Sequence, residues 1–263
     1  MSQGVVIFGF NNHIVDYRAM AEWSAKRIRN FLNLPTTLIT DRPYQSLVFD
    51  QVIIVEPESG NTKYYHEFET SAEWYNRNRY SVFQLSPYDS TLVLDADYVV
   101  NSSQLKILFQ NNREFCCHHK SVDICFSQEF FSSNQFGSWD TPMSWATVLY
   151  FRKTKLAEHV FYIMSMVKDH WYHYRNLYGI SNPVYRNDHA LSIALRILNC
   201  TEAESHIPWN LLSVLPKQHI QQLNIDSWKI SYVSQNKSRY INLKGQDFHA
   251  LGKAQLGEII AKQ

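Results

Sequence analysis

PYDSTLVLDADYVV, residues 87–100, sets two aspartates at the end of an apolar run. The run Thr91 to Leu94 predicts a buried strand, and Asp95 and Asp97 follow it with one alanine between them. Side chains two residues apart in an extended chain share a face, so the two carboxylates are expected to converge. Converging carboxylates repel each other unless a cation lies between them. The segment therefore indicates a divalent metal site, and the alternative is a pair of solvent-facing acids.

Strand and helix patterns alternate around this segment, which predicts an α/β fold with a mostly parallel sheet flanked by helices. In the first half, strands are expected at Gly4–Phe10, Thr36–Asp41 and 51–57, and helices at Asp16–Leu32 and 65–87. In the second half, helices are expected at Ser103–Asn111, Leu156–Leu177 and 186–198, and strands at Asp123–Phe126 and 144–153. No change of composition marks a linker, so one domain over residues 1–263 is expected.

Polar groups follow three of the predicted strands. Phe10 and Asn11 end the first, Asp41 ends the second, and the two aspartates end the fourth. Ligands of open parallel sheets bind outside the carboxyl ends of the strands, so these residues are expected at one edge. The first strand-to-helix turn, GFNNH, lacks the G-x-G-x-x-G fingerprint, which argues against a nicotinamide or flavin enzyme.

Composition restricts the class of protein and of partner. The chain has 45% hydrophobic and 19% charged residues and a formal net charge of +1, so it is globular and carries no global attraction to nucleic acid or membrane. The segment from residue 217 to 263 is basic, with seven Lys and Arg against three Asp and Glu. The spacing of the four cysteines suits neither zinc nor a disulfide between the adjacent pair, and no apolar run approaches the ~20 residues of a membrane span. A cytoplasmic protein without a membrane partner is expected.

The segment DFHALGK, residues 247–253, is the second candidate site. His249 offers a nitrogen ligand for the same metal, while the amide of Gly252 and the ammonium of Lys253 suit a phosphate. Alone the pattern is weak, because a His and a Lys on a surface are common. Together with two aspartates upstream it points to a metal that binds a diphosphate.

Two further aspartates are candidates for acid–base chemistry. Asp188 lies in the first turn of a predicted helix, where a capping role and a functional role are compatible. Asp140 lies in the loop QFGSWDTP before a predicted strand.

The stretches YDSTLVLDADYVV, MSWATVLYFRKT and YRNDHALSIAL resemble GT-A fold glycosyltransferases of the glycogenin and galactosyltransferase-like branch, and more narrowly those of tailed bacteriophages. In that branch the C-terminal motif is H-x-x-G-x-x-K-P, whereas here Lys253 directly follows Gly252. The resemblance implies a transferase that uses a UDP-sugar with Mn²⁺ or Mg²⁺. Residues 1–100 would bind the nucleotide sugar and residues 101–263 the acceptor.

The resemblance also implies roles for single residues. The implied metal ligands are Asp95, Asp97 and His249; the implied donor-binding residues are Phe10, Asn11, Asp41, Arg79, Gly252 and Lys253. Asp188 would face the acceptor or the donor sugar as a base or an orienting group, while Asp140 is a catalytic candidate from its loop and not from the resemblance.

The acceptor implied by the phage resemblance is hydroxymethylated cytosine in double-stranded DNA, modified in the host cytoplasm. A glycan, a protein or a small molecule is the alternative acceptor. Two other classes stay open: a nucleotidyltransferase that uses the paired aspartates, and a binding module without catalytic activity. The first typically has a Gly-rich N-terminal loop with a basic residue, which GFNNHIVDY lacks, and the second has no need of the aspartate pair.

Overall fold

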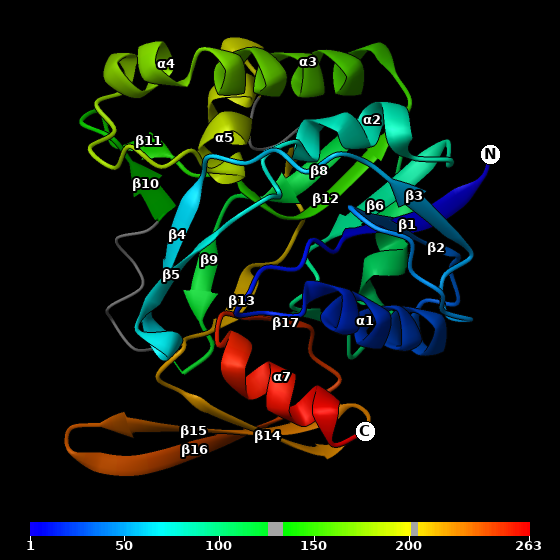
Figure 1. Ribbon diagram of the computed structural model, residues 1–263, viewed down its shortest axis with the longest axis vertical. Helices are drawn as coiled ribbons and strands as arrows, with labels where there is room; N and C mark the ends of the chain where they lie inside the picture. Colours follow the sequence, from blue (N-terminus) through cyan, green and yellow to red (C-terminus); the bar gives the residue numbers. More distant parts are fainter. Residues whose placement is uncertain (126–133, 201–204) are drawn as a thin grey trace.

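The structure is a computed structural model that describes residues 1–125, 134–200 and 205–263. A six-stranded sheet in the order β3-β2-β1-β6-β12-β8 forms its centre (Figure 1). Its strands are β1 (Gln3–Phe8), β2 (Thr36–Thr40), β3 (Gln51–Ile54), β6 (Ser90–Leu94), β8 (Phe115–His118) and β12 (Trp145–Arg152). Strands β3, β2, β1 and β6 run parallel to one another, and β12 lies between β6 and β8 and is antiparallel to both. The predicted α/β class with a mostly parallel sheet is confirmed.

Strand β6 is buried on both faces, as the apolar run of its sequence predicts. It pairs with β1 from Gln3↔Ser90 to Ile7↔Leu94. Gly4 is required in this pair, because an added Cβ would lie 2.3 Å from the ring of Tyr88. The buried pair fixes the point at which β6 ends, and therefore the place of Asp95.

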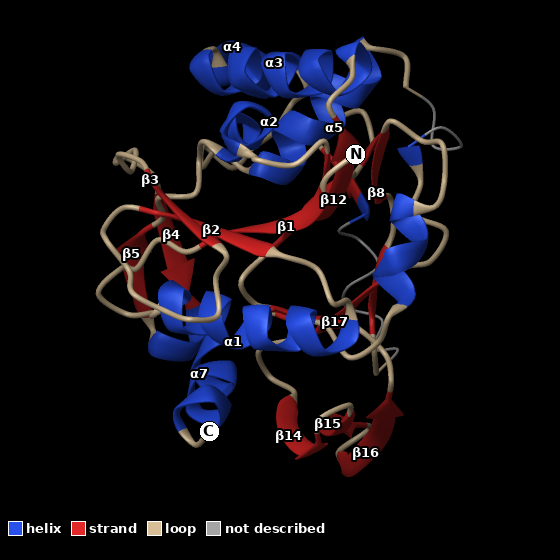
Figure 2. Cartoon of the chain, turned by 90° about the vertical axis from the view of Figure 1, so that its right-hand side faces the viewer, coloured by secondary structure: helices blue, strands red, loops and turns tan. Residues whose placement is uncertain are grey.

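Helices cover both faces of the sheet. Figure 2 shows α2, α3, α4 and α5 on one side, and α1 and α7 on the other. The helices are α1 (Tyr17–Phe31), α2 (Val82–Leu85), α3 (Lys155–Asp169), α4 (Trp171–Leu177), α5 (Asn187–Ile197) and α7 (Lys253–Ala261), with short 3₁₀ turns η1 (His66–Phe68), η2 (Arg79–Ser81) and η3 (Gln104–Phe109). Asp16 caps α1 by accepting the Ala19 N–H at 3.0 Å. Among the described residues, every helix falls short of the length and apolarity that a bilayer-spanning segment requires.

Four smaller sheets extend from this core. A four-stranded sheet has the order β7-β17-β13-β9, with β7 (Tyr98–Val99), β9 (Ser121–Asp123), β13 (Leu211–Val214) and β17 (Phe248–Ala250). An antiparallel sheet contains β14 (His219–Asn224), β15 (Ser227–Ser234) and β16 (Lys237–Lys244). Two hairpins are β4 (Thr62–Tyr65) with β5 (Thr70–Glu73), and β10 (Gln135–Phe136) with β11 (Thr141–Pro142).

The helix predicted over residues 65–87 is wrong for most of its length. The chain there forms β5, completing the β4–β5 hairpin, and turns η1 and η2, and only Val82–Leu85 is α-helical. Glu69 has a φ of 48°, which reverses the chain between the two strands. The β-branched and aromatic residues flanking it favour extended structure, and this local preference outweighs the apparent helical spacing.

Other boundaries differ less. The helix predicted over Leu156–Leu177 breaks at His170 into α3 and α4, and the one predicted over Ser103–Asn111 is the 3₁₀ turn η3. The strand predicted at Asp123–Phe126 is observed earlier, as β9, and its last residue lies outside the described residues.

Candidate functional site

A turn after β6 brings the two aspartates of the opening segment together. The Asp95 N–H donates to the Thr147 carbonyl oxygen on β12 at 3.0 Å, and the Asp95 carbonyl oxygen accepts the Tyr98 N–H at 3.0 Å. Asp97 therefore lies in a tight turn and not in a strand. The predicted convergence occurs, but a turn produces it, and the alternation of an extended strand does not.

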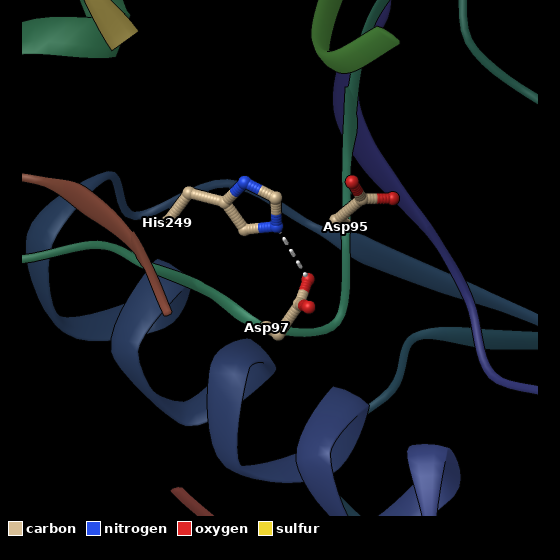
Figure 3. Close-up of side chains that lie close together, drawn as sticks. All are labelled: Asp95, Asp97 and His249. Atoms are coloured by element: carbon tan, nitrogen blue, oxygen red, sulfur yellow. Dashed lines mark ion pairs between the residues drawn. The ribbon is translucent and has the colours of Figure 1, made fainter. Parts of the chain in front are cut away.

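Strand β17 carries His249 to this turn from the far end of the chain. His249 lies opposite Tyr98 in the antiparallel β7–β17 pair, and the Ala250 N–H donates to the Asp97 carbonyl oxygen at 3.0 Å. The His249 Nε2 atom is consequently 3.3 Å from Asp97 Oδ1 (Figure 3). One ligand atom from each of Asp95, Asp97 and His249 lies within 4.8 Å of the others.

The three side chains fit a hard divalent cation. Two carboxylates and an imidazole are ligands that Mn²⁺ and Mg²⁺ accept. An octahedral cation with bonds of about 2.1 Å places adjacent ligand atoms roughly 3 Å apart. The 3.3 Å separation between His249 and Asp97 suits two such adjacent positions, and Asp95 offers a further carboxylate oxygen within 4.8 Å of both.

Each carboxylate of the turn also has a cationic partner. Arg79 pairs with Asp95, and Lys253 pairs with Asp97. Burial raises the pKa of Asp97, but Lys253 and His249 lower it by more, so this pKa lies well below the usual range of a carboxyl group. Asp97 is thus ionised at neutral pH although only 5% of it is exposed.

Arg79 retains hydrogen-bonding capacity at the site. It is 2% exposed, and its Nε and Nη2 atoms have no hydrogen-bond partner among the residues that the structure describes. Buried guanidinium donors are costly to leave unpaired. Arg79 therefore has donors available for an anionic or sugar oxygen, and its predicted donor-binding role stays a prediction.

The start of α7 lies beside the metal ligands. Gly252 precedes the helix, and the Lys253 N–H donates to Glu67 Oε2 at 2.8 Å. The predicted phosphate-binding pair thus lies next to Asp97, as expected. Its helix N-terminus, however, is held by the carboxylate of η1.

The first two strands end at the same edge. Asn11 donates to Asp16 Oδ1 at 2.8 Å and accepts the Arg18 N–H at 2.9 Å, so its amide is engaged at the start of α1. Phe10 is buried, and Asp41 lies directly after β2 with one oxygen 3.4 Å from Arg42.

Asp188 is bonded to the strand β12 that also binds the turn, whereas Asp140 lies on the separate β10–β11 hairpin. Asp188 Oδ1 accepts the Ala146 N–H at 2.9 Å, and its Oδ2 accepts from Arg186 at 2.7 Å. Burial raises the pKa of Asp188, but Arg186 and the Ala146 N–H lower it by more, so the group stays ionised. Asp140 is exposed in the β10–β11 turn, which lies beside α4 and α5 in Figure 1.

The β4–β5 hairpin adds residues that the sequence analysis missed. The Tyr65 hydroxyl lies 3.2 Å from Asn12 Nδ2 and 3.1 Å from the Tyr17 hydroxyl. Lys63, two residues before Tyr65 on the same strand, interacts electrostatically with Asp95 and Asp97. The β-branched and aromatic residues of TKYY favour a strand, but the segment has no alternation that would have identified one from the sequence.

No protein-family model and no curated protein matches the chain. One similar solved structure is an active-site mutant of LgtC, with 14% identity, 73% of this chain and 69% of that chain covered, and a TM-score of 0.49. Another is the galactosyltransferase LgtC in complex with donor and acceptor sugar analogs, with 14% identity, 73% of this chain and 70% of that chain covered, and a TM-score of 0.47. The apo-form glycosyltransferase GlyE of Streptococcus pneumoniae TIGR4 is also similar (15%, TM-score 0.45), with 79% of this chain but 45% of that chain covered. The similarity to these structures is low, and the function proposed below rests on the chain's own residues.

Proposed function

We propose that the protein is a metal-dependent glycosyltransferase of the GT-A type that transfers a sugar from a UDP-sugar to an acceptor hydroxyl. The observation that carries the proposal is the convergence of Asp95, Asp97 and His249 at the carboxyl edge of the parallel strands. This edge is where open α/β sheets bind nucleotides. The surrounding cations suit a diphosphate leaving group.

Different residues would bind the metal and the diphosphate in the proposed reaction. Asp95, Asp97 and His249 would hold Mn²⁺ or Mg²⁺, which when bound neutralises charge on the departing diphosphate. Arg79 offers unpaired donors to a phosphate or sugar oxygen, and Lys253 lies beside the same carboxylates. Fixed cations at the leaving group stabilise the transition state more than the ground state, because negative charge grows there.

The nucleoside end of the donor would lie along β1 and β2. Phe10, Asn11 and Asp41 end these strands, and Asp41 presents a carboxylate to which a ribose hydroxyl can donate. Gly252 would bind the phosphates near α7 once they displace the Glu67 carboxylate that now lies beside it. The first part of the chain, residues 1–100, supplies most of this surface, and residues 101–263 supply the C-terminal ligand and the acceptor side.

Asp188 is the proposed catalytic or orienting acid. It is ionised and fixed by Ala146 and Arg186, and Ala146 is adjacent in β12 to the residue that binds the Asp95 amide. An ionised carboxylate there can orient the donor sugar or accept the proton of the acceptor hydroxyl. Asp140, on an exposed hairpin, would act from the acceptor side.

We further propose hydroxymethylated cytosine in double-stranded DNA as the acceptor, reached in the cytoplasm of a phage host. Its support is the sheet β14–β16, whose segment from residue 217 to 244 has five basic residues, Lys217, Lys229, Lys237, Arg239 and Lys244, against the single acid Asp226. Such a surface attracts a phosphate backbone without reading its sequence.

Mass spectrometry of donor and acceptor tests the proposal. The protein with Mn²⁺ is incubated with a panel of UDP-sugars, with and without hydroxymethylcytosine DNA. The matched variants are Asp95→Asn and, at the other end of β6, Asp89→Asn. We expect UDP release and a sugar-mass gain on DNA that Asp95→Asn abolishes and Asp89→Asn retains.

Other results separate the alternatives. UDP release without a DNA adduct would retain the transferase and reject the DNA acceptor, leaving a glycan, protein or small molecule. Release of inorganic diphosphate from a nucleoside triphosphate would indicate a nucleotidyltransferase. Absence of both UDP release and UDP binding would reject the transferase.

A further inference from the structure

The β4–β5 hairpin faces the metal-ligand cluster with one side of β4. Lys63 and Tyr65 are two residues apart in this strand and so share a face. The Lys63 ammonium lies 5.5 Å from the centre of the Tyr65 ring. Tyr65 in turn contacts Asn12 and Tyr17, which belong to the turn and helix that follow β1. The face that carries Lys63 is therefore the face that looks toward the candidate site.

The hairpin is fixed at two places around this site. On one side the Tyr65 hydroxyl is held by Asn12 and Tyr17. On the other side Glu67, in the connection between the strands, accepts the Lys253 N–H at the start of α7. Lys63 therefore belongs to an anchored element, and its ammonium interacts electrostatically with Asp95 and Asp97 of the cluster.

Lys63 has charged neighbours but no ion pair within the described part of the chain. The charged groups whose fields act on it are Lys253, Asp97, Arg186 and Asp95. The two carboxylates are already paired, with Lys253 and with Arg79. Burial of the ammonium among protein atoms lowers the pKa of Lys63 most, Lys253 and Arg186 lower it further, and Asp97 and Asp95 raise it, which leaves this pKa at about 8. Other atoms of the residue remain accessible to solvent, so a ligand can reach it.

Such a cation suits an anionic ligand. An ammonium without a carboxylate of its own is unfavourable beside other cations until negative charge is added. Its neighbours identify which part of the donor would supply that charge. Lys63 lies within the fields of the metal ligands and of Arg186, the partner of Asp188. In the proposed function the metal would bind the diphosphate and Asp188 would face the sugar. The phosphate bonded to the sugar is the part of the donor between these two positions.

We propose that Lys63 binds the distal phosphate of the nucleoside diphosphate, the one bonded to the sugar in the donor. This role rests on the proposed function. The ammonium would neutralise the phosphate oxygen on which charge develops when the sugar leaves.

Calorimetric titration of the protein with UDP and with UMP, in the presence of Mn²⁺, tests this role. The variants are Lys63→Met, the conservative Lys63→Arg, and Lys262→Met as a matched loss of an exposed lysine near the end of α7. We expect Lys63→Met to weaken UDP binding about ten- to a hundredfold, the range for one hydrogen bond to a charged group. UMP lacks the distal phosphate, so its affinity should change less than about twofold; Lys63→Arg should retain most UDP affinity, and Lys262→Met all of it.

The outcomes distinguish this role from the function on which it rests. Unchanged UDP affinity in Lys63→Met, beside normal binding by the unmodified protein, would overturn the role of Lys63 alone. An equal loss for UDP and UMP would overturn it too, because that result indicates a disturbed hairpin. If the unmodified protein binds neither nucleotide with Mn²⁺, the proposed function is overturned, and the role of Lys63 with it.

Discussion

The candidate metal-ligand cluster and the β14–β16 sheet both carry several charges, but the charges of the cluster are buried and paired whereas those of the sheet are exposed. At the cluster, Asp97 and Lys253 are 5% and 6% exposed and pair with each other. On the sheet, Lys237 and Arg239 are exposed and form no ion pair within the described residues. Buried charges are tolerated only when compensated, and they act at one point. Exposed charges act over a distance and are screened by salt. The cluster thus holds compensated charge at a fixed point, whereas the exposed charges of Lys237 and Arg239 act over a distance.

The strongest test of this difference removes one charge from the buried pair. Asp97→Asn leaves the buried Lys253 ammonium with the Ala250 carbonyl oxygen but without its counter-charge, and removes a candidate metal ligand. We expect a loss of about 3–5 kcal/mol in the free energy of unfolding and loss of Mn²⁺-dependent UDP binding, measured by urea denaturation and calorimetry.

A second variant separates the two effects of Asp97. Asp97→Asn combined with Lys253→Met removes both charges, so most of the stability should return while UDP binding stays lost. A single variant as stable as the unmodified protein would contradict the view that Asp97 and Lys253 form a compensated pair.

Cationic neighbours keep the buried Asp97 charged, whereas burial keeps His118 neutral. Protonation of His118 at low pH should therefore destabilise the folded state. The Nδ1 of His118 donates to the Trp209 carbonyl oxygen at 2.9 Å, and burial lowers its pKa to about 4. An unfolded histidine has a pKa near ~6.5, so below that pH the unfolded state binds the proton more tightly and stability falls. The contribution is complete above pH ~6.5 and is lost as the pH falls to ~4, about 3 kcal/mol in all.

The measurement for His118 is urea unfolding at pH 7 and pH 4.5. His118→Asn keeps a donor for the carbonyl of Trp209 but does not titrate, so its stability should fall less with acid. Equal acid sensitivity of the variant and the unmodified protein would show that His118 is not held neutral.

The metal-ligand set itself is tested by His249. His249→Gln should lower Mn²⁺ affinity by at least about tenfold, because loss even of a residue that only orients a ligand costs 10–100-fold. Electron paramagnetic resonance of free Mn²⁺ measures the affinity, and His219→Gln, an exposed histidine of β14, is the control. Equal Mn²⁺ affinity in the two variants would remove His249 from the ligand set.

The smallest effect on stability is expected from the sheet. Lys237→Glu with Lys244→Glu should change the free energy of unfolding by less than about 0.5 kcal/mol, because both residues are exposed. The logarithmic salt dependence of DNA binding should decrease by about one per lysine that contacts phosphate. Lys155→Glu, on α3, is the control, and an unchanged salt dependence in the double variant would place the DNA elsewhere.

The part of the fold that the sequence predicted is the part fixed by local patterns. β1, α1 and α5 have clear apolar periodicity and capping or first-turn acids, and they form near the expected residues. The sequence predicts a helix from residue 65 onward, where the second part of the β4–β5 hairpin forms, because the aromatic residues there are spaced much as on a helix. A strand could be predicted there only by knowing that β5 pairs with β4. The excess of basic over acidic residues in the segment 217–244 can be counted in the sequence, but the strands β14, β15 and β16 that carry these residues are not predicted from it.

The candidate site divides in the same way. Asp95 and Asp97 could be predicted to converge because one short turn holds both. From the sequence His249 is a weaker candidate, indicated by its place before Gly252 and Lys253 and by the family resemblance, because its position depends on the pairing of β17 with β7. Lys63 carried no signal in a single sequence, because its proximity to the cluster depends on how a hairpin packs against two distant elements.

The pairing of β17 with β7 also bears on the order of events during folding. It joins segments separated by most of the second half of the chain, and such distant contacts pay a large entropy of loop closure and form slowly. The cation-binding capacity should therefore appear in the last kinetic phase of refolding, after the parallel strands have assembled. Because a cation that binds only the native state stabilises it by mass action, Mn²⁺ would slow unfolding and leave the early folding phases unchanged.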